Sequence, residues 1–469
     1  MTIPAPVSYR RMTTATFQYA TDQFQQLVRD ALQHARKLGA TEAAAEVSEG
    51  YGLSVSVRQQ ALESVERNRD KSLAVTVYLG QRRGHAATSD FAPEALRQTV
   101  AAAYDIARFT AQDTEAGLPD VADVAEAPRP LDLMHAWALS PEEAAALAKR
   151  AERSALATSP MVTNSEGASV SAQHSHFWSA HMRQGRLDGP GVFSGGYASS
   201  RHGVSVAVIA GQGAAMQRDG WYSSMRDPAE LAQPEVVGRY AAERALARVG
   251  AKKIATTECP VLFDAPLAAG LLGSLVHAIS GTALYRRTTF LADAMGQQVL
   301  ASHLQLDEDP FVMKGKGSVP FDDEGVRVAP RQVVTDGVVR GYFLSTYSAR
   351  KLGLRTTGNA GGSHNLRWHS RLTQATDDLP AMLRQLHRGL FVTELMGQGV
   401  NPITGDYSRG AAGYWVENGR IAYPVQEITI AGNLREMFQR VVAMGADAYT
   451  MGAKTTGSVL IERMKVAGN

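Results

Sequence analysis

The chain has 469 residues, of which 44% are hydrophobic and 20% are charged. This composition is ordinary for a globular protein, and it excludes a disordered, collagen-like or disulfide-scaffold protein. The 48 basic and 46 acidic residues leave a net charge of +2, too little to bind nucleic acid without a local basic patch. The length alone predicts two or three domains.

The cysteine content and the uncharged stretches predict where the protein resides. The single cysteine, Cys259, can form no internal disulfide and no cysteine-rich zinc site, which favours a reducing compartment. No apolar stretch follows Arg10 and Arg11, so we expect no export leader. Residues 265–285 are uncharged but contain glycines and polar side chains, which favours a buried helix over a membrane span. We therefore expect a cytoplasmic protein.

The first 110 residues predict a helix, several strands and a second helix. Residues 1–20 are expected to form a loose tail. The apolar spacing that follows predicts a helix capped by Thr21 or Asp22 and ended by Gly39. Alternating apolar residues then predict strands. We predict a turn at residues 49–52, a strand that starts at residue 53, and strands that span residues 63–68 and 73–79. A helix is predicted to start at Pro93.

Residues 112–130 contain five acidic residues and three prolines, which predicts an exposed connection. Ser140 to Glu143 then reads as a capping box that opens a helix. Strand-like sequence follows to residue 224, and Pro234 opens another helix. The main domain boundary is placed near residue 250, so an α+β domain is expected over 21–250.

The remaining residues, 251–469, predict a second α+β domain. A short apolar strand at 261–263 leads into a long helix from Pro266. Residues 389–432 contain eight glycines among many short β-prone runs. This pattern favours a large, mostly antiparallel sheet with tight turns over repeated βαβ units.

Histidines mark two places where metal chemistry is conceivable. His174 and His176 would point to the same face of a strand, with His181 a few residues on. Such a set can hold a metal, but the sequence supplies no nearby carboxylate, which favours surface or interface histidines. His277 lies in the middle of the uncharged helix, where a lone histidine is usually a core residue.

Long stretches of the second half resemble the PmbA, or TldE, branch of the TldD/PmbA family. Runs of this length are far more specific than any short motif. The stretches that carry the resemblance are 277–281, 285–291, 320–327, 345–354, 392–400, 404–413 and 427–434.

The resemblance implies a subunit of a bipartite metalloprotease. The TldD branch is similar to zinc peptidases with a His-Glu-x-x-x-His helix and a late cysteine ligand. The PmbA branch is its partner in a heterodimer, and the pair degrades or trims unstructured peptides. Older naming links the family to modulation of DNA gyrase.

Carried onto this sequence, the metal motif is degenerate. His277 matches the first histidine, Ala278 the glutamate that would act as general base, and Thr282 the second histidine. Residues 455–458 contain no thiol. A zinc peptidase needs three protein ligands and a carboxylate that accepts a proton. The resemblance therefore implies no catalytic residue and no metal ligand in this chain, with zinc in the partner.

The motif spacing also predicts a break in the helix. Residues five apart on an α-helix are about 140° out of phase, so the helix must end or distort between the two histidine positions. Gly281 stands at that place.

Three functions are thus open. The leading hypothesis is a non-catalytic subunit that pairs with a TldD-like partner and admits unfolded peptides. Whether the chain forms a homodimer without that partner is left open by the sequence. The second is an independent metallopeptidase whose metal is held by His174, His176 and perhaps His181. The third is a regulator associated with DNA gyrase or nucleic acid, which the near-zero net charge disfavours.

Overall fold

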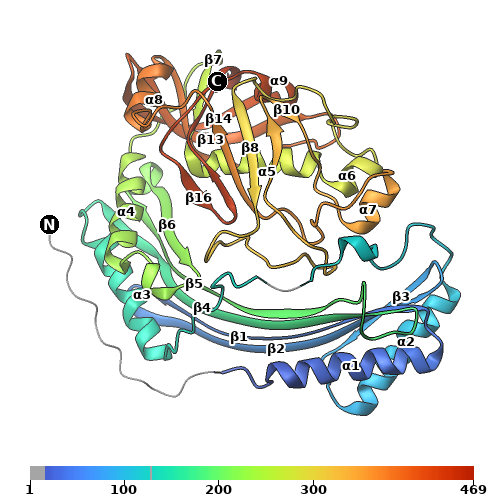
Figure 1. Cartoon of the computed structure of the whole chain (residues 1–469). Coiled ribbons are helices and arrows are strands. Elements are labelled where there is room, and N and C mark those ends of the chain that lie inside the picture. The colour runs from blue at the N-terminus through green and yellow to red at the C-terminus, as the bar shows by residue number, and fades with distance from the viewer. Residues whose placement is uncertain (1–15, 127–128, 469) are drawn as a thin grey trace.

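The computed structural model describes residues 16–126 and 129–468. In this part of the chain, a six-stranded antiparallel sheet forms the N-terminal half, in the order β3-β2-β1-β4-β5-β6 (Figure 1). Residues of β1 alternate between its two faces, and Ala43, Ala45 and Val47 are buried on one of them. The strands are β1 (Glu42–Arg58), β2 (Ala61–Leu79), β3 (Arg82–Thr88), β4 (Val162–Arg183), β5 (Ser194–Ala210) and β6 (Gln217–Met225).

Helices cover one face of this sheet, and the C-terminal half lies over the other (Figure 1). One apolar core joins α1 and α2 to β1 and β2, and another joins α3 and α4 to β4 and β5. The face opposite the helices carries polar side chains, among them Glu46 and Thr76, which line a cleft described below. The helices are α1 (Thr21–Leu38), α2 (Pro93–Phe109), α3 (Pro141–Leu156) and α4 (Pro234–Ala247).

The turn predicted at residues 49–52 does not exist, because β1 runs through it and pairs with a strand on each side. Glu49, the first residue of the predicted turn, is only 1% exposed and forms an ion pair of 2.6 Å with Arg69. The strands predicted at 63–68 and 73–79 are likewise one strand, β2.

The N-terminal segment is only partly described. Residues 1–15 of the predicted tail lie outside the described residues, so the prediction is not examined there. The backbone N–H groups of Gln18 and Tyr19 donate to the Glu49 carboxylate at 2.8 and 3.2 Å. The last residues before α1 are therefore held against the sheet, and the prediction of a loose tail is wrong for them.

The helix ends agree in part with the sequence signals. Ala20, not Thr21 or Asp22, is the N-cap of α1, and the Gln23 side chain accepts a hydrogen bond from its N–H at 2.8 Å. Gly39 ends α1 with φ 96°, a conformation that glycine adopts without steric cost. The predicted capping box at Ser140 and the proline-led starts of α2, α3 and α4 are confirmed.

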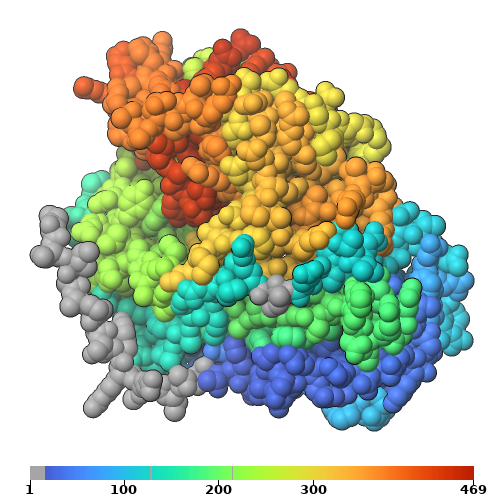
Figure 2. Space-filling model, viewed as in Figure 1, coloured from blue at the N-terminus to red at the C-terminus, as the bar shows by residue number. Residues whose placement is uncertain are grey.

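The connection at 112–130 is exposed in places but anchored in others. Its residues 127–128 lie outside the described part of the chain. Leu118 and Asp123 are buried, and the Asp123 carboxylate lies 2.5 Å from the Arg355 guanidinium of the C-terminal half. Acidic residues that suggested a solvated linker instead form ion pairs with basic residues of the C-terminal half. Figure 2 shows this segment lying against that half.

The C-terminal half contains two sheets where the sequence predicts one. One sheet has the order β10-β9-β8-β11-β17-β16 and the other β14-β13-β12-β7-β18-β15. β14 also pairs with β18, so five strands of the second sheet close into a ring. Both are mostly antiparallel, and the α+β class is confirmed. The strands are β7 (Thr257–Phe263), β8 (Leu304–Asp309), β9 (Arg331–Thr335), β10 (Val338–Val339), β11 (Asn365–Ser370), β12 (Gly389–Met396), β13 (Asp406–Glu417), β14 (Arg420–Asn433), β15 (Val441–Met444), β16 (Tyr449–Met451), β17 (Lys454–Thr456) and β18 (Val459–Ala467).

The uncharged helix predicted from Pro266 is α5, and it lies in the core of this half. Leu272 and Leu275 are fully buried against both sheets. Among residues 16–126 and 129–468, no helix combines the length and apolarity needed to cross a membrane. The helices of this half are α5 (Ala265–Ala278), α6 (Gly281–Tyr285), α7 (Thr346–Lys351), α8 (Leu379–Leu386) and α9 (Leu434–Gln439).

Candidate functional site

The long uncharged helix breaks where the motif spacing requires it. α5 ends at Ala278 and α6 begins at Gly281. In the gap, the Gly281 N–H donates to the Phe343 carbonyl at 2.8 Å, and the Phe343 N–H donates to the Ile279 carbonyl at 3.1 Å. A Cβ on Gly281 would lie 2.2 Å from the Ser348 hydroxyl, so only glycine fits here.

The three positions of the degenerate metal motif flank this break. His277 and Thr282 are exposed, on α5 and α6 respectively, and Ala278 is 1% exposed. The prediction that His277 is a core residue is wrong, because α5 buries the face that carries Leu275 and Ala278. In the part of the chain that the structure describes, no three His, Cys, Asp or Glu side chains are grouped to hold a metal ion. The residues at these positions do not fit zinc.

Neither Cys259 nor the C-terminal strands supply a thiolate. Cys259 is buried in β7, and burial raises the pKa of its thiol to about 11. A metal ligand must be the deprotonated thiolate, which this environment disfavours. In the late segment, the Ser458 hydroxyl and N–H both donate to the Asp447 carboxylate, at 3.1 and 2.8 Å. Hydrogen bonds between Ser458 and Asp447 therefore hold that segment, which contributes no thiolate ligand.

The histidines of β4 do not converge on one site. His174 and His176 point to the helix-covered face, where their rings stack on Tyr51 at 4.4 Å and on Phe24 at 4.6 Å. His181 is an odd number of residues further on, so it faces the opposite side and lines the cleft. The metal site of the second hypothesis is therefore not formed.

Burial keeps these imidazoles neutral. Desolvation, with a contribution from His202, lowers the pKa of His174 to about 4. Desolvation and the nearby Arg183 lower the pKa of His181 to about 3. The Nδ1 atoms of His174, His176, His181 and His202 are buried without a hydrogen-bond partner among the described residues.

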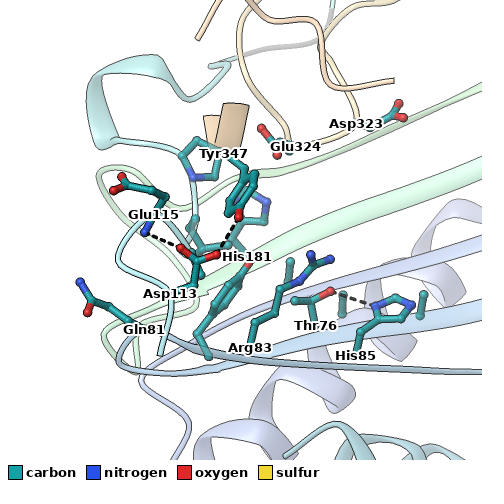
Figure 3. Close-up of a pocket in the computed structure, with 18 of the residues that line it drawn as sticks. Thr76, Gln81, Arg83, His85, Asp113, Glu115, His181, Asp323, Glu324 and Tyr347 are labelled. Carbon is teal, nitrogen blue, oxygen red and sulfur yellow. Dashed lines mark hydrogen bonds between the residues drawn. The ribbon is translucent and has the colours of Figure 1, made fainter. Parts of the chain in front are cut away.

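A cleft of about 450 Å³ lies between the polar face of the N-terminal sheet and the C-terminal half (Figure 3). Its walls come from β1, β2, β3 and β4, from residues 110–119, from the loop at 323–324 and from Tyr347. We call it the carboxylate cleft after its acidic lining residues, which are Glu46, Asp113, Glu115, Asp323 and Glu324.

Asp113 ties one wall of the carboxylate cleft to the other. Its carboxylate accepts hydrogen bonds from the Tyr347 hydroxyl at 2.7 Å (Figure 3) and from the Lys351 ammonium at 2.8 Å. These two bonds lower the pKa of Asp113 to about 2. Asp113 is therefore ionised and already paired at neutral pH.

Asp322 shapes the loop on the facing wall. Its buried carboxylate accepts backbone N–H bonds from Glu324 at 2.9 Å, Val326 at 2.8 Å and Ala360 at 3.0 Å. Burial and the charge of Glu324 nevertheless raise the pKa of Asp322 to about 7. This network fixes the backbone that presents Asp323 to the cleft.

Sequence reasoning missed Glu46 and Asp323 as site residues. Burial, followed by the charge of Asp323, raises the pKa of Glu46, and burial with Glu324 raises that of Asp323. Burial, followed by the charges of Asp323 and Glu46, raises the pKa of Tyr197 to about 12. The alternation of apolar residues from Ala43 to Val47 could have placed Glu46 on the face opposite the helices.

A second cavity, of about 820 Å³, lies between β6 and the C-terminal half. Its lining is more apolar and includes Trp221, Tyr449 and Leu366. The edge strands β6 and β16 both contribute to its walls. The interface between the two halves thus contains two cavities, the carboxylate cleft and this one.

Comparison with family profiles covers most of the chain. Residues 43–107, 135–249 and 256–468 match domain 1, the central domain and the C-terminal domain of PmbA/TldA metallopeptidases. Among solved structures, one from Bacteroides thetaiotaomicron, described as a candidate modulator of DNA gyrase, superposes with a TM-score of 0.86 at 25% identity, covering 96% of this chain and 100% of that one. TldE from Thermococcus kodakarensis superposes with a TM-score of 0.78 at 19% identity, over 95% and 99% of the two chains.

The curated relatives are more similar in sequence. Metalloprotease PmbA of Escherichia coli O157:H7 is 46% identical over 424 residues, which cover 90% of this chain and 91% of the relative. A PmbA homolog of Haemophilus influenzae is 40% identical over 457 residues, 97% of this chain and 99% of the relative. With three consecutive domains matched and identity at this level over nearly full length, the chain belongs to the PmbA/TldD family of metallopeptidases.

Proposed function

We propose that this chain is the non-catalytic subunit of a two-subunit cytoplasmic metalloprotease that processes or degrades unstructured peptides. The observation that carries the proposal is the degenerate motif at the break between α5 and α6, where Ala278 and Thr282 replace a general base and a ligand. Activation of water requires a metal with an open position beside a proton acceptor. The methyl group of Ala278 and the hydroxyl of Thr282 provide neither the metal site nor the general base.

The missing chemistry belongs to a TldD-like partner in a heterodimer, whose His-Glu-x-x-x-His helix holds zinc. The family contains both branches, since a TldD homolog of Haemophilus influenzae is 28% identical over 203 residues of this chain. The retained break at Gly281 supports descent from a catalytic form, because a helix that needs no ligands at that spacing needs no break.

Unfolded peptides suit the hollows between the halves. A folded protein could not enter a cleft of about 450 Å³, whereas an extended chain can lie along it and pair with exposed strand edges. This chain would then help to hold the peptide while the partner cleaves it.

A reconstitution assay tests the proposal. This chain, a TldD-type subunit and their mixture are each incubated with a disordered peptide, and fragments are measured by mass spectrometry. Cleavage is expected only when the TldD-type subunit is present, and a Glu-to-Gln change in that subunit's motif should abolish it. Chelator-sensitive cleavage by this chain alone would overturn the proposal in favour of an independent metallopeptidase.

A further inference from the structure

β6 is the last strand of the N-terminal sheet, and part of its free edge opens into the second cavity. Five consecutive residues of this strand, 221–225, line that cavity. A strand that presents a face contributes every second residue to a cavity, whereas a strand that presents its edge contributes successive residues. β6 therefore turns its backbone edge toward the second cavity.

The register of β6 identifies the backbone groups on this edge. Residues of an antiparallel strand bond alternately toward the neighbouring strand and away from it, and β6 pairs with β5 without a bulge. The Arg218 carbonyl accepts a hydrogen bond from the Arg248 side chain at 3.0 Å. The Gly220 N–H donates to the Asp219 carboxylate at 2.7 Å. The even-numbered residues of β6 therefore point away from β5.

Tyr222 and Ser224 continue this pattern into the second cavity. Their N–H and C=O groups lie on the outer edge, and none of them bonds to another residue within 16–126 and 129–468. The outer edge thus has two parts. At residues 218 and 220 a side chain of this protein occupies an outward group, whereas at residues 222 and 224 two donors and two acceptors remain free.

The uncharged sequence of this edge is unusual for a strand without a partner. On the opposite side of the sheet, β3 covers only residues 73–79 of β2, and no other described strand pairs there with residues 61–72. That open stretch contains six charged residues, which discourage pairing with another chain. Residues 221–225 contain no charge and no proline. The free part of β6 therefore lacks the features that block the addition of a strand.

The second cavity has the size and lining to hold an extended chain. Its volume of about 820 Å³ lies within the usual range for ligand cavities. Two edge strands approach each other there, since the rings of Trp221 on β6 and Tyr449 on β16 are 5.5 Å apart (Figure 1). Tyr240 of α4 contacts Trp221 at 4.8 Å. These aromatic walls keep water from part of the space, which strengthens hydrogen bonds made at the edge.

We propose that an extended segment of the substrate peptide adds to β6 in the second cavity, as a further strand that pairs with the backbone of Tyr222 and Ser224. An extended polypeptide carries N–H and C=O groups on every second residue, which matches the spacing of these two residues. Because the backbone is recognised, many sequences fit if they are unfolded. The inference rests on the proposed function, since the occupant is its peptide substrate, and it assigns no step of cleavage to β6.

Backbone-methylated peptides test this pairing on the isolated full-length chain. The parent probe is a fluorescein-labelled decapeptide of alternating serine and valine. Two further probes carry N-methyl groups either on the serine amides or on the valine amides, which blocks opposite edges of the extended peptide. One methylated probe should bind like the parent probe and the other about tenfold more weakly, as measured by anisotropy. Equal affinities of the two methylated probes would overturn the pairing.

Proline substitutions locate the site on β6. Ser224→Pro removes an outward N–H and keeps the ladder to β5, because an edge strand tolerates proline where its nitrogen faces away from the sheet. This variant should bind the parent probe about fivefold more weakly. Arg218→Pro makes the same change at an outward residue that does not line the cavity, and it should bind like the parent chain. Equal binding by the two variants would contradict the proposal.

Hydrogen exchange on the parent chain gives a readout that needs no variant to fold. Saturation with the parent probe should slow exchange within residues 217–225, where the amides of Tyr222 and Ser224 gain partners. Exchange within residues 61–72 of β2, the charged open stretch, should stay unchanged. Protection of both stretches, or of neither, would contradict the proposal.

The outcomes also separate this inference from the proposed function. Failure of these tests while the two-subunit enzyme still cleaves peptides would remove the β6 site and keep the subunit proposal. Strand addition to β6 together with failure of the reconstitution would keep the peptide site and remove the subunit proposal.

Discussion

Burial of neutral histidines links the stability of the N-terminal sheet to pH. His174 is 4% exposed, and its pKa lies near 4 in the folded chain against about 6.5 in an unfolded one. Between pH 4 and pH 6.5, His174 binds a proton in the unfolded chain but not in the folded chain. Stability from this group is therefore complete above pH 6.5 and falls as the pH drops towards 4. Asp322, with a raised pKa near 7, acts with the opposite sign.

Replacing His174 separates its contribution to the pH dependence of stability from the contribution of Asp322. His174→Gln should have a fixed cost at pH 8 and should lose the pH dependence that His174 provides. Between pH 7 and pH 5 the parent should therefore lose about 1–2 kcal/mol of unfolding free energy relative to the variant. Urea unfolding at both pH values measures the difference. A difference between the two proteins that is the same at pH 7 and pH 5 would show that His174 is not a buried neutral group.

At the scale of elements, α5 determines the stability of the C-terminal half. Leu272→Asp places an unpaired charge in a core where the parent side chain is fully buried, so we expect a loss of at least about 4 kcal/mol. His277→Asp makes the corresponding change at an exposed position of the same helix and should cost about 1 kcal/mol or less. Chemical denaturation followed by circular dichroism compares them. Similar costs for the two variants would mean that α5 is not a core element.

The sequence predicts elements well where one signal is strong and local. The prolines at 93, 141 and 234, Gly39, and the capping box at Ser140 all place helix ends within a residue or two. β1 was wrongly predicted to be interrupted at residues 49–52, where Glu49 is buried and forms an ion pair with Arg69 that only the folded sheet creates. Local charge cannot reveal a partner 20 residues away.

The candidate site likewise has a part that the sequence predicts and a part that only the fold reveals. The motif positions His277, Ala278 and Thr282 and the helix break could be placed from sequence, because they lie within one short segment. The exposure of His277 could not, since it depends on which face of α5 meets the sheets. The carboxylate cleft joins Glu46 to Asp323, which are far apart along the chain, so only the fold brings them together.

At the scale of the whole molecule, the segment after α2 joins the two halves. Asp113→Asn removes the acceptor shared by Lys351 and Tyr347, both of the C-terminal half. The groups are partly exposed, so we expect less than about 1 kcal/mol of global stability to be lost. Local opening should nevertheless make protease cleavage within residues 112–126 several-fold faster.

A matched variant controls for the change of charge in that segment. Glu115→Gln alters a carboxylate that binds only its neighbour at residue 114, so its cleavage rate should equal that of the parent. Limited proteolysis with mass spectrometry of the fragments measures all three proteins. Equal cleavage of Asp113→Asn and the parent would mean that this anchor does not hold the segment.

Zinc content is the most direct test of the claim that this chain lacks catalytic machinery. The isolated full-length chain, prepared without chelators and dialysed against micromolar zinc, should retain no stoichiometric metal by inductively coupled plasma mass spectrometry. Its complex with a TldD-type subunit should retain about one zinc per heterodimer, and replacing that subunit's motif histidines should remove it. About one zinc per chain in the isolated protein would contradict the account.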